Sequence, residues 1–459
     1  MTTGRTLTGR CSSALLFVLF VFGACSSSTS SPAPVAAPTT ATSSASSTED
    51  LAPTTVVPQN LESTVAPDQP PTTSRGPADP VEVAGLSGTL LLRNADGDVV
   101  TAHPDGTLRN ELASGVGRLN SQPTWSSTAD HIAYSSLSAE GATLEIVSVA
   151  DGSGTSTPLQ TPPFYLSWST DDSWVGALRP ITGSIEFVIV DSTTGAARPI
   201  GSGQTFYFDW HDDQNLIAAI NATTLVAIPA QPSLQPSERT TETPLGRFQT
   251  PSGVGVAGTE GPDVLLALAR DGANEVVLLS PDGSETEYGR ADGPVSISTN
   301  PIDQQIAVLV TDSEPRSQVI SLQTDESREL PAGRVSIVDR ASGEVITRDE
   351  SRIIAIQWSP DGEKLAMLQA EGGMLRWLVA TPEGVTSMTQ FVPTRELAAA
   401  YLPFSDQYNH SSTWWSPDSR AIVTAGTIGS DTGIWVDLID DDRDALLVSS
   451  GDIAVWSPR

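Results

Sequence analysis

The chain has 459 residues and a formal net charge of -31 at pH 7, with 55 acidic and 24 basic side chains. So acidic a surface repels phosphate backbones, which argues against nucleic-acid binding. Gly (37 residues) and Pro (34 residues) are plentiful, a composition typical of all-β proteins with many turns. The length leaves room for one large repeat domain with ancillary segments.

Residues 1–24 have the pattern of a signal peptide. Arg5 and Arg10 precede an apolar run of eleven residues that is too short to span a bilayer as a helix. The run ends in Phe22-Gly23-Ala24-Cys25, which resembles the lipobox of bacterial lipoproteins. That resemblance implies cleavage before Cys25 and diacylation of its side chain, and two acyl chains are enough for stable anchoring. We therefore expect a lipid-anchored protein on the extracytoplasmic face of the cell membrane; a secretory signal cut elsewhere is the alternative.

Residues 25–83 are dominated by Ser, Thr, Pro, Ala and Val and show no hydrophobic periodicity. Such a stretch cannot bury enough apolar surface to offset the entropy lost when its backbone is ordered. We expect a disordered tether that holds the folded domain, residues 84–459, roughly 40 Å from the membrane.

Three short predicted strands follow the tether, within residues 89–109. The first two are separated by Asn94-Ala95-Asp96-Gly97-Asp98, which places oxygen side chains at alternate positions around a Gly. A hairpin turn is the favoured interpretation, because the segment lacks the twelve-residue spacing and distal Glu of a calcium loop. A second acidic run, at residues 440–444, is interpreted as a solvated loop.

A repeat of about 42 residues then begins, in which an apolar strand ends in Trp and a polar turn leads into a second strand. Trp125, Trp168 and Trp210 are spaced by 43 and 42 residues, and Trp415 and Trp456 by 41. This is the period of four-stranded β-propeller blades. We expect the Trp side chains to pack between blades.

The clearest copy spans residues 354–368 and contains Trp358-Ser359-Pro360-Asp361-Gly362. Pro presets φ for the first corner of the turn, Asp can accept hydrogen bonds from the turn backbone, and Gly takes positive φ at low cost. The pattern resembles the WD40-like repeat of TolB-type β-propellers, over residues 86–459. The resemblance implies an all-β propeller and raises a role in envelope assembly, although TolB-type proteins carry a small α/β domain where this chain has its tether.

The chain ends on residues 453–459, a first strand with no second strand after it. Pairing of this strand with the N-terminal strands would close the ring and leave no exposed sheet edge. This count gives eight four-stranded blades, with seven as the alternative. The interval from Ile297 to Trp358 is long, at 61 residues, and its sequence suggests an extra hairpin at residues 335–346.

The sequence lacks the common catalytic and cofactor-binding motifs. It contains no G-x-S-x-G elbow, no G-x-x-x-x-G-K-[ST] loop, no H-E-x-x-H pair and no Cys pair suited to zinc. His131 and His211 lie in or beside predicted turns, where we expect solvent-facing side chains. We therefore expect no cofactor and no metal, and favour a protein without enzymatic activity.

The best candidate for a functional segment lies between Thr394 and Thr413, directly before a predicted first strand, where a propeller channel opens. Aromatic and hydrogen-bonding side chains alternate in it, as in recognition surfaces. A structural plug that caps the channel is an equal alternative. The candidate binding residues are Tyr401, Phe404, Asp406, Gln407, Tyr408 and His410.

Together these features favour a monomeric, membrane-tethered propeller that binds a protein, peptide or glycan without chemistry. A propeller hydrolase or lyase with an acid and a His at the channel mouth is one alternative. A TolB-like partner in envelope assembly is the other.

Overall fold

The computed structural model describes residues 78–459 except 205, 213–214, 222, 235, 239–246, 259–260, 312–317, 322–326, 348–351 and 440–442; for residues 238, 247–258, 261–262, 318–319, 321 and 347 only the backbone is described. The predicted signal peptide, Cys25, most of the predicted tether and residues 440–442 of the acidic run therefore lie outside the described residues.

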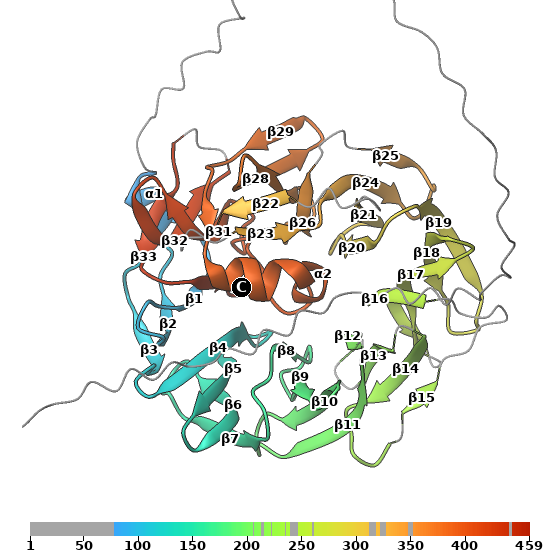
Figure 1. The fold of residues 1–459 in the computed structure, drawn as a ribbon, viewed down its shortest axis with the longest axis horizontal. Coiled ribbons are helices and arrows are strands. Elements are labelled where there is room, and N and C mark those ends of the chain that lie inside the picture. Colours follow the sequence, from blue (N-terminus) through green and yellow to red (C-terminus); the bar gives the residue numbers. More distant parts are fainter. Residues whose placement is uncertain are drawn as a thin grey trace, which may run out of the picture. The chain divides into compact units, whose positions relative to one another are not determined.

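The described part of the chain is a β-propeller of eight four-stranded antiparallel blades, which succeed one another in chain order (Figure 1). In blades 2 to 8 the first strand lies nearest the centre, and in blade 1 that place is taken by β34. Blade 1 contains β1 (Leu90–Arg93), β2 (Val99–Ala102), β3 (Asn110–Ala113) and β34 (Ile453–Trp456), and blade 2 contains β4 (Arg118–Trp125), β5 (His131–Ser138), β6 (Gly141–Ser148) and β7 (Gly154–Leu159). Blade 3 contains β8 (Tyr165–Trp168), β9 (Trp174–Ile181), β10 (Ser184–Asp191) and β11 (Ala197–Gly203), and blade 4 contains β12 (Phe206–Trp210), β13 (Asn215–Ile220), β14 (Thr224–Pro229) and β15 (Ser237–Glu238).

Blades 5 to 8 follow the same plan. Blade 5 contains β16 (Arg247–Gly258), β17 (Gly261–Arg270), β18 (Ala273–Leu279) and β19 (Glu285–Ala291), and blade 6 contains β20 (Val295–Thr299), β21 (Gln305–Thr311), β24 (Gly333–Asp339) and β25 (Val345–Thr347). Blade 7 contains β26 (Ile353–Trp358), β27 (Leu365–Glu371), β28 (Met374–Thr381) and β29 (Gly384–Ser387), and blade 8 contains β30 (Val392–Pro393), β31 (Ala421–Ile428), β32 (Asp431–Leu438) and β33 (Leu446–Ser449).

The ring closes as the sequence predicts. The last strand, β34, pairs with β1 in antiparallel register, with Val455 opposite Leu91. Just beyond the strands, the Ser457 amide donates to the Thr89 carbonyl at 2.8 Å, and the Thr89 amide donates to the Ser457 hydroxyl at 2.9 Å. The C-terminal strand is thus the inner strand of blade 1, while the N-terminal strands supply its other three.

The hairpin predicted at residues 335–346 is present as β24 and β25, so the count of eight blades holds. The long interval before Trp358 arises instead from a second hairpin, β22 (Gln318–Ser321) and β23 (Ser327–Leu330), inserted between β21 and β24. This hairpin packs against strands of blades 7 and 8 and buries Ile320 and Leu330. Among the described residues, sheet pairing links blade 6 to blade 7 only where Gly333 meets Ile353.

The Trp side chains at the ends of the inner strands are buried between blades, as predicted. Three of them also bond to the backbone of the preceding blade. The indole N–H groups of Trp210, Trp358 and Trp415 donate to the carbonyls of Ser167, Ser298 and Gln357 at 3.2, 3.1 and 3.2 Å. Each bond satisfies a buried donor and fixes the spacing of neighbouring blades.

The turns after these Trp residues have the geometry that their residue types favour. The Ser359 hydroxyl donates to Asp361, the Glu363 amide donates to the same carboxylate at 3.0 Å, and Gly362 has φ of 71°. The turns also contact each other around one face of the ring, which we call the turn face. There, for example, the Asp361 amide in the turn of blade 7 donates to the Ser419 hydroxyl in the turn of blade 8 at 3.1 Å.

The packed domain begins before the predicted boundary at residue 84. Residues 80–84 form a short helix, α1 (Pro80–Ala84), capped by Asp79, and Ala78 and Val83 are buried. The Ala78 amide donates to the Asp444 carbonyl at 2.8 Å, which fixes this segment beside blade 8. The buried apolar residues explain the difference, since they are too few and too widely spaced to produce a periodic signal. Within the described residues, no helix has the length and apolar character needed to cross a membrane.

Candidate functional site

The predicted functional segment interrupts the inner strand of blade 8, rather than preceding it. The strand starts as β30, whose residues pair with Thr427 and Gly426 of β31, and resumes at Trp415, which pairs with Ile422 of β31. Residues 394–412, here called the central segment, leave the strand between these points and occupy the middle of the ring (Figure 1). They form a π-helical turn (Leu397–Tyr401), a 3-10 turn (Leu402–Phe404) and α2 (Ser405–Tyr408).

Gln407 joins the central segment to blade 4 in the manner of an extra strand residue. Its side-chain amide donates to the Phe208 carbonyl at 2.7 Å, and its side-chain oxygen accepts from the Phe208 amide at 3.1 Å. The Tyr165 hydroxyl of blade 3 donates to the Gln407 carbonyl at 3.0 Å. Gln407 therefore completes the hydrogen bonding of an inner strand that has no neighbour on its channel side.

The segment also reaches blades 2 and 7. The Tyr408 hydroxyl lies 2.6 Å from the side-chain oxygen of Gln122 and 2.7 Å from the Phe164 carbonyl. On the other side, the Asn409 side chain donates to the Ile356 carbonyl at 2.7 Å. Because blade 3 and blade 7 lie opposite each other in an eight-bladed ring, the segment spans the channel.

The six candidate binding residues do not lie on one surface. Tyr401, Gln407 and Tyr408 are buried, and the rings of Tyr401 and Tyr408 lie 4.4 Å apart. Burial raises the pKa of the Tyr408 hydroxyl well above its ordinary value. These three side chains plug the channel. Phe404 is 37% exposed and Asp406 is partly exposed, so a role in binding stays a prediction for them.

His410, the sixth candidate, pairs with a residue that the sequence did not indicate. His410 lies near the end of the central segment, and its Nδ1 atom is 3.1 Å from the side chain of Asp209 in β12 of blade 4. Both side chains are 13% exposed. Burial lowers the pKa of His410, but the carboxylates of Asp209 and Asp406 outweigh it, so the net pKa is raised. Asp209 precedes a Trp in an inner strand, and no local pattern distinguishes it from a turn residue.

The base of the central segment is held by a buried Arg that the sequence also did not indicate. Arg93 donates through Nε to Asp452 at 2.9 Å, and its guanidinium lies 3.1 Å from Glu396. Another guanidinium nitrogen donates to the Asn120 carbonyl at 2.7 Å. One side chain thereby joins blade 1, blade 2 and the central segment.

The other His residues are dispersed. His103 lies in a turn, 3.0 Å from Asp105. The side chain of His211, which was expected to face solvent, is only 5% exposed, and its Nδ1 atom lies 3.2 Å from Asp212. His131 is partly buried, with its ring 6.5 Å from that of Trp168. No group of three His, Cys, Asp or Glu residues suited to a metal occurs within the described residues.

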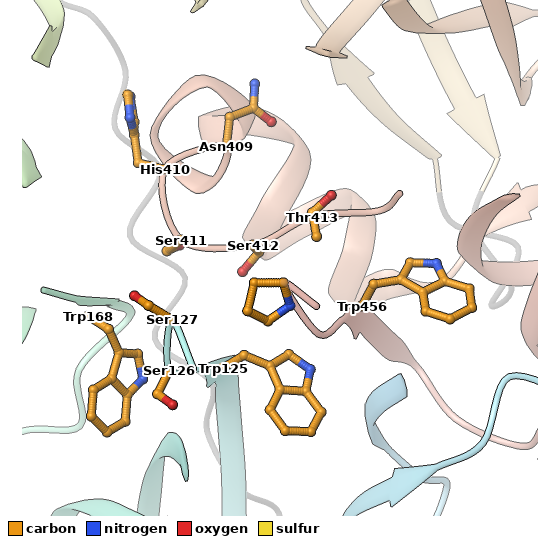
Figure 2. A pocket seen from close by; sticks show the side chains of 11 residues that line it. Trp125, Ser126, Ser127, Trp168, Asn409, His410, Ser411, Ser412, Thr413 and Trp456 are labelled. Carbon is orange, nitrogen blue, oxygen red and sulfur yellow. The ribbon is translucent and has the colours of Figure 1, made fainter. Parts of the chain in front are cut away.

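A hollow lies on the turn face, where the central segment meets blades 1, 2 and 3. It has a volume of about 210 Å³ (Figure 2). Hydroxyl and indole groups dominate its walls, and no carboxylate, Lys or Arg side chain lines it. The lining residues are Trp125, Ser126, Ser127, Trp168, Asn409, His410, Ser411, Ser412, Thr413, Trp456 and Pro458.

This pocket includes one predicted candidate, His410, and omits the other five. Sequence reasoning missed the four lining Ser residues because Ser is common in turns, so no local pattern marks them as site residues. Only the closed ring brings Ser127 and Ser412 to the same hollow, as Figure 2 shows. Such a site suits binding through hydrogen bonds rather than through charge.

Comparison with known protein families and with curated protein sequences found no match. Solved structures similar to this chain include TolB from Acinetobacter baumannii, at 17% identity over 66% of this chain and 65% of that one, with a TM-score of 0.36. An oligogalacturonate lyase in complex with manganese matches at 12% identity, over 62% and 82% of the chains, with a TM-score of 0.44. The C-terminal WD40 domain of Sif2 matches at 11% identity, over 77% and 93%, with a TM-score of 0.49. This chain thus spans 65% of that TolB, and these likenesses concern the fold alone.

Proposed function

We propose that this chain is a membrane-anchored extracytoplasmic lipoprotein whose propeller binds an envelope protein, peptide or glycan without chemistry. The observation that carries the binding function is the hollow at the turn-face end of the channel, built by the central segment and three blades. The lipobox at residues 22–25 supports the anchor, and the long Ser-, Thr- and Pro-rich stretch after it supports a tether. A TolB-like role in envelope assembly is one form of this function.

The anchor is tested by the variant Cys25→Ala. Because lipid attachment needs the thiol, we expect the variant to leave the membrane fraction, whereas Cys11→Ala, the matched control, should remain there. Metabolic labelling with a fatty acid should mark the parent chain and the Cys11 variant but not the Cys25 variant. Labelling of the Cys25 variant, or its unchanged membrane retention, would contradict the anchor.

Binding is tested by affinity capture from detergent-solubilised envelopes with the full chain as bait. Deleting the central segment is unsuitable, because it would expose the inner strands that Gln407 and Asn409 satisfy. Ser412→Trp instead fills the pocket, while the backbone carbonyl of Ser412 keeps its bond from Gln357 at 2.9 Å. Ser387→Trp, on the exposed outer strand β29, is the control. We expect Ser412→Trp alone to lose the captured partner; an equal yield from both variants would refute binding at this pocket.

The hydrolase or lyase alternative has one feature in its favour, the buried pair of His410 and Asp209 in the channel. The pair also has a structural use, since it joins the central segment to blade 4. If the protein is an enzyme, His410→Gln should abolish turnover of a captured ligand and leave the binding of that ligand intact. Release of the ligand unchanged by the parent chain supports the binding function instead.

A further inference from the structure

Ion pairs attach both ends of the central segment to the blades. At its start, Glu396 lies 3.1 Å from the guanidinium of Arg93, a group that keeps its charge across the physiological pH range. Near its end, His410 lies 3.1 Å from Asp209 of β12, and a His side chain gains or loses its charge near neutral pH. The two ends of the segment therefore respond differently to pH.

The pair of His410 and Asp209 lies where its charge acts strongly on the central segment. Both side chains are 13% exposed, and the Nε2 atom of His410 is buried with no hydrogen-bond partner among the described residues. Bulk water therefore screens the pair only weakly. Asp209 directly follows Phe208, whose backbone bonds to the side chain of Gln407. A change in the charge of the pair thus acts beside the bonds that hold α2 in the channel.

The charged groups that act on His410 are two carboxylates, Asp209 in β12 and Asp406 in α2. The surrounding elements β8, β12 and α2 also carry Tyr side chains, and burial raises the pKa of each of these hydroxyls, so they stay neutral below about pH 10; they are Tyr165, Tyr207 and Tyr408.

The other elements around this site add no charge to it. The strands β20 and β26, which pack against α2, contain no titratable side chain, and neither do the other residues that line the hollow. His211, just beyond β12, pairs with Asp212. Within the described residues, the proton on His410 therefore supplies the positive charge that offsets Asp209 and Asp406.

Loss of this proton leaves two carboxylates in a nearly enclosed space without a cation between them. A neutral His410 can still donate one hydrogen bond to Asp209, but it no longer attracts the carboxylate by its charge. Asp406 and Asp209 then repel each other, and the repulsion acts between α2 and blade 4.

We propose that His410 is a pH-dependent switch that holds residues 405–412, the end of the central segment, against blade 4 when it is protonated and releases them when it is neutral. Residues 409–413 form one wall of the hollow, so the switch also regulates the proposed binding site. That regulation rests on the proposed function, whereas the switch itself does not.

The direction of the pH effect follows from the raised pKa of His410. A His whose pKa is higher in the folded chain than in the unfolded chain, where it is near 6.5, stabilises the folded chain fully below that pH. The stabilisation is lost as the pH rises through the folded pKa. The end of the segment is therefore held in mildly acidic conditions and released in alkaline ones.

Hydrogen–deuterium exchange of the full chain in detergent, measured by mass spectrometry from pH 5.5 to 9, tests the switch. Each rate is divided by the intrinsic exchange rate at the same pH, so that the ratio reports opening of the structure. We expect peptides that cover residues 405–412 to exchange several-fold faster as the pH rises, while peptides that cover β27 keep their protection. Constant protection of residues 405–412 across this range would overturn the proposal.

Variants of the pair attribute the change to His410. His410→Asn retains a neutral donor and cannot gain a charge, so residues 405–412 should show the weak protection of the alkaline state at every pH. Asp209→Asn removes a carboxylate that favours the charged His410, so the loss of protection should occur at lower pH. His103→Asn is the matched control, because His103 lies 3.0 Å from Asp105 in the turn between β2 and β3. The switch is wrong if His410→Asn keeps the pH dependence of the parent chain, or if His103→Asn removes it.

The switch and the proposed binding function can fail separately, because exchange is measured without a ligand. If exchange depends on pH through His410 but Ser412→Trp leaves capture of an envelope partner unchanged, the switch stands and binding at the hollow is wrong. If exchange does not depend on pH but Ser412→Trp abolishes capture, the switch is wrong and the binding function stands. If both hold, capture by the parent chain should weaken as the pH rises, and capture by His410→Asn should not change with pH.

Discussion

At the scale of single residues, Arg93 holds together three parts of the ring, through Asp452, the Asn120 carbonyl and Glu396. We expect Arg93→Met to leave Asp452 and Glu396 without their cation and to lower the free energy of unfolding by about 2–4 kcal/mol. The loss stays below the full value for a buried pair, because the Asp452 side chain is 37% exposed.

Urea unfolding followed by circular dichroism measures this change. Arg376→Met is the control, since its partner Glu371 is 40% exposed and the pair should contribute at most about 1 kcal/mol. A similar loss from both variants would show that the contacts of Arg93 contribute no more to stability than an exposed ion pair does.

At the scale of elements, the turn that contains Trp415-Ser416-Pro417-Asp418 joins blade 8 to the segment before β1, because the Asp418 carboxylate accepts a hydrogen bond from the Ser87 amide. Partial burial raises the pKa of Asp418, but hydrogen bonds from Ser416 and the Ser87 amide outweigh it, so the net pKa is lowered. A carboxyl whose pKa is lower in the folded chain stabilises it above the unfolded pKa, near 3.9. This stability is lost as the pH falls through the folded pKa.

We therefore expect Asp418→Asn to lower Tm near pH 7 by several degrees and to reduce the fall in Tm below about pH 4. Differential scanning calorimetry from pH 2.5 to 7 measures both effects. Asp431→Asn, in the exposed start of β32, is the control and should change neither. If the Tm of Asp418→Asn falls below pH 4 as steeply as that of the parent chain, the Asp418 carboxylate does not contribute to the pH dependence of stability.

Elements were predictable from sequence where a local residue pattern determines them. The turn at Asp361, the hairpin of β24 and β25 and the strand ending at Trp456 all rest on turn chemistry and two-residue alternation. The central segment was recognised as unusual but misplaced, because β30 has only two residues and includes Pro393, too short a strand to show a period. The pocket could not be predicted, since its lining depends on how the ring brings distant turns together.

At the scale of the whole molecule, stability depends on closure. β34 supplies the inner strand of blade 1, so a chain ending at residue 452 would expose β1 and remove buried Trp456. We expect this truncation to abolish cooperative thermal unfolding, because an open ring leaves the edge of β1 unpaired and the core beside it uncovered.

Calorimetry and limited proteolysis measure this loss. Removal of Arg459 alone is the control, because its side chain makes one exposed bond, to the Ser127 carbonyl at 3.2 Å. A cooperative transition in the chain ending at residue 452 would mean that the remaining blades hold the ring without the closing strand.

The central segment has a consequence for how this protein can evolve. Propellers gain and lose blades by duplication or deletion of whole repeats, since each repeat contacts mainly its neighbours. Here one segment bonds to Phe208 on one side of the channel and to Ile356 on the other. An added or missing repeat would change the channel's diameter and pull these acceptors out of reach. The number of repeats is therefore fixed by a few hydrogen bonds at the axis, and lineages that vary it must first lose or rebuild that segment.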